Sequence, residues 1–328
     1  MKPWSIDVPV LLIFFVRDDT FSKVFESVRQ ARPRTLLLWQ DGPRDNRPDD
    51  LVGIERCRVI AESIDWDCEV HRNYHTENMG CDPSTHYAHK WAFSIVDKCI
   101  VMEDDQVPDQ SFYPFCKELL DRYENDERVN HICGYNCLTD ATWCPNDYLF
   151  AYTGSGVWAS WRRVAETWDS EYNCLDDSYN MRNLQSHYGK RSDYWLAYAQ
   201  RHRNSGIAHW ESILGLSEHL QSRYAIIPKV NLAQNCGISQ NATHSTVDSL
   251  ELIPKKDRVI YQQAQAMTFP LKHPTAVLPD SEYTERLAKL MNPGKGHQFC
   301  KQLEMLWIMI RNGRFEMLKK RIRAKMRG

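Results

Sequence analysis

The chain has 328 residues, of which 42% are hydrophobic and 26% are charged. These values are close to globular averages, and they exclude a disordered, collagen-like or multi-span membrane protein. The formal net charge of −2 is unevenly distributed, because residues 301–328 hold nine basic and two acidic side chains. That segment carries +7 and leaves −9 for residues 1–300, so an acidic body is joined to a basic C-terminal segment.

Apolar runs and helical patterns alternate along the first 135 residues. Strands are expected over residues 8–16, 35–39, 64–70, 99–102 and 129–133. Helices are expected around residues 21–28, 51–57, 87–95 and 112–123. Strands that alternate with helices of this length predict an α/β fold with a mostly parallel sheet, buried on both faces.

Polar side chains stand where these strands end, at the sheet edge beyond which α/β proteins bind ligands. They are Arg17, Asp41, Asn73 and the run Glu103-Asp104-Asp105, called the acidic motif below. Three carboxylates after a buried strand repel one another, which raises a pKa or calls for a cation such as Mn²⁺ or Mg²⁺. A solvated acidic loop is the alternative. No Gly-x-Gly-x-x-Gly follows the first strand and no P-loop motif occurs, which argues against those phosphate sites.

Three segments resemble the GT-A nucleotide-sugar glycosyltransferases: Val10 to Asp18, Trp39 to Gly42, and the acidic motif with its flanks. The nearest branches are the N-acetylglucosaminyltransferase I-like enzymes and related bacterial transferases of surface-polysaccharide synthesis. The resemblance covers roughly residues 8–245 and is most specific at the acidic motif. It implies a Rossmann-like domain, a UDP-sugar donor, and a glycan or lipid-linked saccharide acceptor.

The resemblance also implies a role for each residue at the sheet edge. Asp105 matches the aspartate that binds Mn²⁺ (or Mg²⁺) on the donor diphosphate, while Glu103 and Asp104 lie near the ribose and sugar. Asp41 matches the aspartate that reads the uracil, and Arg17 matches an arginine near the nucleotide.

Further positions follow from the same resemblance. Asn78 and Gly80 match a loop beside the donor, and a glycine before a helix N-terminus also suits phosphate on physical grounds. Trp158 lies in a segment similar to the family's glycine-tryptophan segment at the acceptor site, although most aromatic residues after position 140 are expected in the core. His244 is expected at the metal or the diphosphate; a structural role is the alternative.

The tripeptide His209-Trp210-Glu211 resembles the place where the family carries an aromatic residue followed by a catalytic carboxylate. Glu211 is therefore the candidate general base, which an inverting single displacement requires within hydrogen-bond reach of the acceptor hydroxyl. The alternative is a surface glutamate on a helix.

The C-terminal part is expected to add no second core. Residues 1–250 form the catalytic domain in this interpretation, and the proline-containing residues 251–297 wrap around it. Residues 298–328 predict a basic amphipathic helical tail, with apolar positions such as Leu303 and Trp307 on one face. Such a tail suits an anionic membrane surface, and an oligomer contact is the alternative.

Cysteine use and the N-terminal sequence bear on location. The eleven cysteines are an odd number scattered through apolar runs, which favours reduced thiols, and Cys133, Cys137 and Cys144 give only a weak zinc signal. No leader-like segment precedes Val8, so we expect a cytoplasmic protein. The basic tail adds the alternative of a peripheral position on the inner face of the cytoplasmic membrane. Nucleic acid is not an expected partner of the acidic body.

Together these features predict a metal-dependent inverting glycosyltransferase that moves a sugar from a UDP-sugar donor, in surface-polysaccharide synthesis. One rival is a sugar-phosphate nucleotidyltransferase, which is disfavoured because that class usually opens with a glycine-rich loop and a basic residue after the first strand. Another is a non-catalytic, metal-dependent glycan-binding protein of the same fold.

Overall fold

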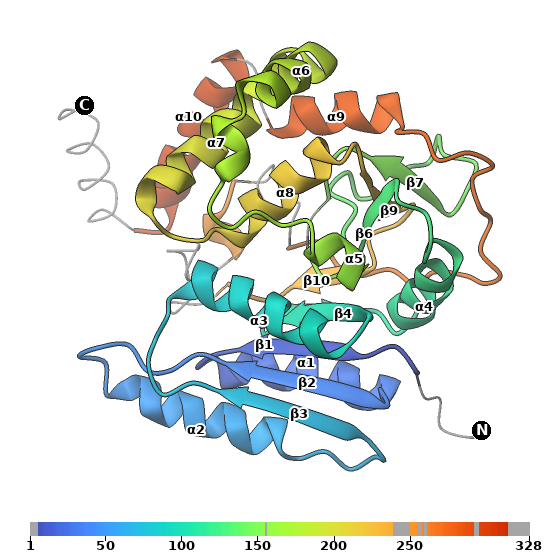
Figure 1. Ribbon diagram of the computed structural model, residues 1–328. Coiled ribbons are helices and arrows are strands. Elements are labelled where there is room, and N and C mark those ends of the chain that lie inside the picture. Colours follow the sequence, from blue (N-terminus) through green and yellow to red (C-terminus); the bar gives the residue numbers. More distant parts are fainter. Residues whose placement is uncertain are drawn as a thin grey trace.

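A computed structural model describes residues 6–154, 156–238, 250–254, 258, 261–291 and 295–313 (Figure 1). The described chain is a mixed α/β structure with a mostly parallel central sheet and helices on both faces, so the predicted fold class is confirmed. The sheet's strand order is β3-β2-β1-β4-β8-β6-β9-β7. Strands β8 and β7 run antiparallel to their neighbours, and the other six share one direction.

The strands of the central sheet are β1 (Val10–Phe14), β2 (Thr35–Gln40), β3 (Glu69–Tyr74), β4 (Lys98–Glu103), β6 (Val129–Cys133), β7 (Tyr148–Ala151), β8 (Trp158–Trp161) and β9 (Tyr224–Pro228). A separate two-stranded sheet pairs β5 (Gln106–Pro108) with β10 (Ala233–Asn235). The helices are α1 (Asp18–Ala31), α2 (Asp49–Ala61), α3 (Cys81–Ile95), α4 (Phe112–Arg122), α5 (Arg162–Ala165), α6 (Ser178–Tyr188), α7 (Lys190–Ser205), α8 (Trp210–Leu220), α9 (Ser281–Met291) and α10 (Lys295–Arg311). Short 3₁₀ helices cover Asn173–Asp176 and Leu250–Leu252.

Alternation along the strands divides the core between the two faces of the sheet. In β1, Leu12 belongs to the larger core cluster, into which α1, α2 and α4 pack. Its neighbour Leu11 belongs to a second cluster, which contains residues of α3 and α8 (Figure 1). Both residues are fully buried, as expected for a strand covered by helices on both faces.

The third strand lies further along the chain than predicted. The expected range was 64–70, whereas β3 spans Glu69–Tyr74. The alternation that suggested the earlier range comes from Ile64 and Trp66, which pack on the core from the preceding loop; Trp66 donates a hydrogen bond from Nε1 to the Pro33 carbonyl at 2.8 Å. Asn73 therefore lies within the strand and not beyond its end.

Much of the segment expected to wrap the domain lies along the core without regular structure. Met267 and Leu271 are buried in the larger cluster, and the Met267 N–H donates to Ser111 Oγ at 2.8 Å. The segment also contains helix α9, which was not expected in a proline-containing segment. This helix buries Tyr283, which is only 1% exposed. The domain boundaries themselves stay predictions.

Helix α10 begins the predicted tail. It buries Ile308, while Leu303, Trp307 and Ile310 are 49%, 58% and 55% exposed on a shared helical face. Residues 314–328 lie outside the described residues. None of the described helices is both long and apolar enough to cross a bilayer.

Candidate active site

The acidic motif lies where β4 ends, beside the end of β1. The register pairs Glu103 with Ile13, which brings the residues after β1 alongside the motif. The Arg17 guanidinium forms an ion pair with Asp104 and a second one with Asp105, at 3.1 Å. Asp104 is only 5% exposed and also accepts a hydrogen bond from the Phe15 N–H at 3.2 Å. The sheet edge thus brings Arg17 and the acidic motif together.

Burial and mutual repulsion act on the carboxylates of this cluster. Burial, followed by the charges of Asp105 and Glu211, raises the pKa of Glu103 to about 8. Burial also raises the pKa of Asp104, although the Arg17 guanidinium and the Phe15 N–H oppose that shift. The charge of Glu211 acts on Glu103 from α8, so the candidate base belongs to the same electrostatic cluster as the motif.

Asp105 has one carboxylate oxygen without a hydrogen-bond partner in the described residues. Its Oδ1 is buried without a hydrogen-bond partner in the described structure, whereas Oδ2 faces Arg17. The segment after β10 forms a wall here: the Cys236 N–H donates to the Asp105 carbonyl at 2.7 Å, and a Cβ at Gly237 would collide with Oδ2. Among the described residues, no three histidine, cysteine or acidic side chains already converge as a metal-binding set.

Asp41 holds the segment that leads into α3. Its carboxylate accepts hydrogen bonds from the Asn78 side-chain amide at 3.0 Å and from the main-chain N–H groups of Gly42, Met79 and Gly80 at 2.9–3.2 Å. A Cβ at Gly42 would collide with the backbone of Glu77, so only glycine fits at this position. In this conformation both oxygens of Asp41 serve the segment, and recognition of a uracil by Asp41 stays a prediction.

The first turn of α3 connects this segment to the acidic motif and to α8. Partial desolvation, then the charges of Glu103 and Asp82, raise the pKa of the Cys81 thiol to about 12. Asp82 in turn faces His209, with Oδ2 and Nδ1 3.2 Å apart. His209 is the N-cap residue of α8, and the exposed Glu211 lies in the first turn of that helix. The Asp82–His209 contact therefore ties the donor-side segment to the helix that carries the candidate base.

Tyr135 is a site residue that the sequence analysis missed. It follows β6 and is 7% exposed, and its hydroxyl is buried with no hydrogen-bond partner in the described residues. Burial, then the charges of Asp105 and Glu103, hold the pKa of this hydroxyl well above its usual range. Gly156, at φ +85°, leaves the space that the Tyr135 ring occupies. The sheet-edge rule, applied to the fifth predicted strand, is the signal that could have identified it.

The remaining candidates differ in where they lie. Trp158 is 3% exposed and packs in the core, stacked on Trp210 with ring centroids 6.2 Å apart. It supports the α8 N-terminus from beneath, and direct contact with a sugar would require its ring to be uncovered. His244 lies outside the described residues. Asn78 and Gly80 stand beside Asp41, as described above.

Comparisons with known proteins give weak similarities only. No protein-family model and no curated protein matches the chain. Among solved structures, 4-diphosphocytidyl-2C-methyl-D-erythritol synthase from Anaerococcus prevotii has 6% identity and a TM-score of 0.28, over 48% of this chain and 73% of that one. Mouse xyloside xylosyltransferase 1 has 12% identity and a TM-score of 0.31, over 65% and 81%. At these TM-scores the similarities give this chain no function.

Proposed function

We propose that the protein is a metal-dependent, inverting glycosyltransferase that uses a UDP-sugar donor and a glycan or lipid-linked saccharide acceptor. The observation that carries the proposal is the cluster at the carboxyl end of β4: the acidic motif, Arg17 from the end of β1, and Glu211, whose charge contributes to the raised pKa of Glu103. Carboxylates crowded at this edge of an α/β sheet favour a divalent cation and a phosphate-bearing ligand.

The residues present fit a Mn²⁺ or Mg²⁺ ion. The buried Oδ1 of Asp105 has no partner in the described structure, and oxygen ligands suit both ions. Such ions often take one or two protein carboxylates and complete their coordination with water and substrate phosphates, so a preformed protein cage is not required. When bound, the ion would offset the negative charge of the diphosphate leaving group. Arg17 would then orient Asp104 and Asp105 around the donor.

Glu211 is the proposed general base. It is exposed at the start of α8, where an acceptor hydroxyl has access to it. In the transfer, the acceptor oxygen bonds to the anomeric carbon as the bond from that carbon to the UDP oxygen breaks. The hydroxyl proton passes to the Glu211 carboxylate, and UDP leaves with the electron pair. Attack on the face opposite the leaving group inverts the anomeric configuration.

Calorimetry with UDP and Mn²⁺ tests the donor site. Asp105→Asn keeps the size of the side chain and should abolish the metal-dependent part of UDP binding. Asp193→Asn, at an exposed position on α7, serves as the matched control. Metal-dependent UDP binding of wild-type strength in the Asp105 variant would refute the assignment.

The reaction itself is tested with a panel of UDP-sugars and Mn²⁺, in which hydrolysis or transfer is followed by release of UDP. Glu211→Gln should reduce transfer while UDP binding persists, because a general base acts on the acceptor and not on the nucleotide. Formation of a UDP-sugar from UTP and a sugar 1-phosphate would instead identify a nucleotidyltransferase. UDP binding with no turnover of any donor would favour the non-catalytic binder.

The proposal includes an anionic membrane surface as a partner of the tail. The exposed Leu303, Trp307 and Ile310 of α10 precede a segment, 314–328, that is rich in Lys and Arg in sequence. An apolar face together with basic charge suits anionic lipid. Deletion of residues 299–328 should remove sedimentation with phosphatidylserine-containing vesicles, and unchanged sedimentation would contradict this partner.

A further inference from the structure

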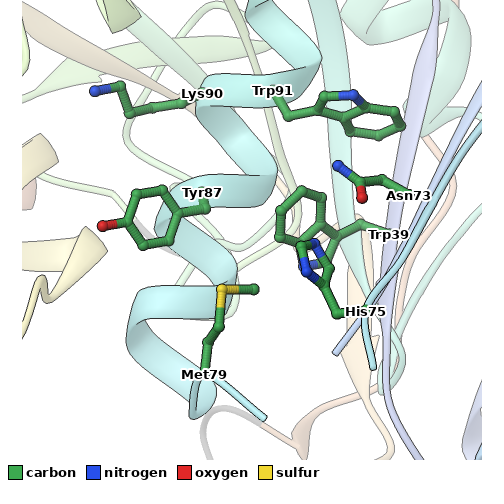
Figure 2. A pocket seen from close by; sticks show the side chains of 7 residues that line it. All are labelled: Trp39, Asn73, His75, Met79, Tyr87, Lys90 and Trp91. Atoms are coloured by element: carbon green, nitrogen blue, oxygen red, sulfur yellow. The ribbon is translucent and has the colours of Figure 1, made fainter. Parts of the chain in front are cut away.

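An open groove of about 510 Å³ lies on the α3 face of the sheet, next to the edge strand β3 (Figure 2). Its volume is within the range of small-molecule sites. It is lined by Trp39 of β2, Asn73 of β3, His75, Met79, and Tyr87, Lys90 and Trp91 of α3. None of these residues belongs to the ion-pair cluster of the acidic motif, so the groove is a feature separate from the proposed reaction centre.

Aromatic rings line one side of the groove (Figure 2). The Trp39 and Trp91 rings have centroids 5.8 Å apart and are tilted by 48°, and the His75 ring lies 4.4 Å from that of Trp39. Trp39 is fixed by a 2.9 Å hydrogen bond from its Nε1 to Ser84 Oγ of α3. Because the two indoles are not parallel, they do not form a slot for a flat base. Single aromatic faces beside open space suit the C–H face of a pyranose ring.

Polar groups lie on two sides of the groove. Figure 2 shows the Asn73 amide between Trp91 and Trp39, whereas Tyr87 and Lys90 extend from α3 toward the opposite side. Among the described residues, neither the Asn73 side chain nor Lys90 has a hydrogen bond or ion pair, and the buried Nε2 of His75 has no partner. Aromatic faces bordered by an amide and an ammonium group that have no partner in the described residues match the alternating C–H and hydroxyl surfaces of a sugar.

The groove lies next to the donor side of the proposed active site. Met79 lines the groove, and its main-chain N–H donates to Asp41. The same short segment includes Gly80, which precedes the α3 turn beside the acidic motif. A chain of sugars held in the groove would therefore lie next to the segment that borders the reaction centre.

We infer that this groove is a carbohydrate-binding subsite, which holds a sugar ring of the acceptor glycan away from the bond being formed. The identity of the occupant as an acceptor rests on the proposed function, whereas the capacity of the groove to bind sugar does not. Trp91 provides a stacking surface on one side and Tyr87 a second one on the other, and Asn73 and Lys90 offer hydrogen bonds to hydroxyl or carboxylate substituents.

The test measures glycan binding without donor. Wild-type protein in EDTA is applied to an array of oligosaccharides built from hexoses, N-acetylhexosamines and uronic acids, and the best-retained free oligosaccharide is then titrated calorimetrically. Trp91→Ala should weaken its binding roughly tenfold, which corresponds to about 1.4 kcal/mol. Trp307→Ala, a tryptophan exposed on α10, is the matched control and should bind like wild type.

A second variant guards against misfolding, because Trp91 also packs against the core cluster. Tyr87 is 49% exposed, so Tyr87→Ala combined with Lys90→Ala should fold normally and still weaken binding. The inference is overturned if no oligosaccharide is retained, if the groove variants bind as wild type does, or if UDP and Mn²⁺, added in a parallel titration without EDTA, displace the glycan. Asp105→Asn should leave glycan binding intact. A wrong donor assignment would therefore appear in the UDP titration, and a wrong assignment of the groove would appear in the glycan titration.

Discussion

The raised pKa of Glu103 predicts an unusual pH dependence of stability, and Glu103→Gln isolates it. In the folded chain the pKa of this carboxyl is about 8, against 4.5 for the group in water. A carboxyl with a raised pKa holds its proton better in the folded state, so its contribution is fully present below about pH 4.5. That contribution is lost as pH rises toward 8. Gln is neutral at every pH and keeps the size of the side chain, so the variant should lack this loss.

The size of the effect follows from the shift. Each pKa unit corresponds to 1.36 kcal/mol, so a shift from 4.5 to 8 sets an upper limit of about 5 kcal/mol at alkaline pH. Glu103 is half-buried and its charge is shared with neighbouring carboxylates, so water and the neighbours reduce that limit. We expect the Gln variant to be more stable than wild type by about 2 kcal/mol at pH 8.5 and nearly equal to it at pH 4.5.

Urea unfolding in EDTA at several pH values between 4.5 and 8.5 measures the difference directly. The matched control is Glu55→Gln, an exposed glutamate on α2, whose curve should run parallel to that of wild type. If the free energy of unfolding of the Glu103 variant also ran parallel to wild type, or if the variant were less stable at pH 8.5, the electrostatic argument would be refuted.

Three further predictions concern residues that shape the site. Tyr135→Phe removes a buried hydroxyl without a partner in the described residues, so we expect no loss of melting temperature but a roughly tenfold lower kcat/KM for transfer, measured with UDP-sugar and Mn²⁺. Asp82→Asn removes the partner of His209 and should lower the free energy of unfolding in urea by less than about 1 kcal/mol. The same variant should change kcat by a larger factor than KM, because Glu211 loses its orientation. An equal effect on both constants would contradict that role. Gly156→Ala should cost about 3 kcal/mol or more, since its Cβ would meet the Tyr135 ring at a positive φ. Gly206→Ala, at a positive φ in open space, should cost only about 1–2 kcal/mol in the same urea assay.

The sequence allowed prediction of those features that depend on local patterns. Uninterrupted apolar runs located β1, β2 and β4 within a few residues, because strands covered on both faces need apolar side chains throughout. The rule that ligand groups gather where parallel strands end then placed Arg17 with the acidic motif. The ion pairs of Arg17 with Asp104 and Asp105 are the contacts that this reasoning anticipates.

Features that depend on distant parts of the chain were not predictable in this way. Strand β8 inserts antiparallel between β4 and β6, an order that chain position alone does not reveal. The contact of Asp82 with His209 joins residues 127 positions apart, and neither residue belongs to a recognisable motif. The hydrogen bonds of Asp41 to the 78–80 segment arise because that segment folds back over the end of β2, and the contact of Asp41 with a ligand stays a prediction.

The charge of the site constrains how a donor would enter it. Within the described residues, Arg17 is the cation that pairs with the acidic motif, so the cluster is net negative if its carboxylates are ionised. Two like charges 4 Å apart repel by about 4 kcal/mol at an effective dielectric constant of 20, which disfavours a bare diphosphate beside these carboxylates. A divalent ion between them turns repulsion into attraction. On the proposed function, metal and UDP should therefore each tighten the binding of the other by the same factor, because coupling between two ligands of one site is reciprocal.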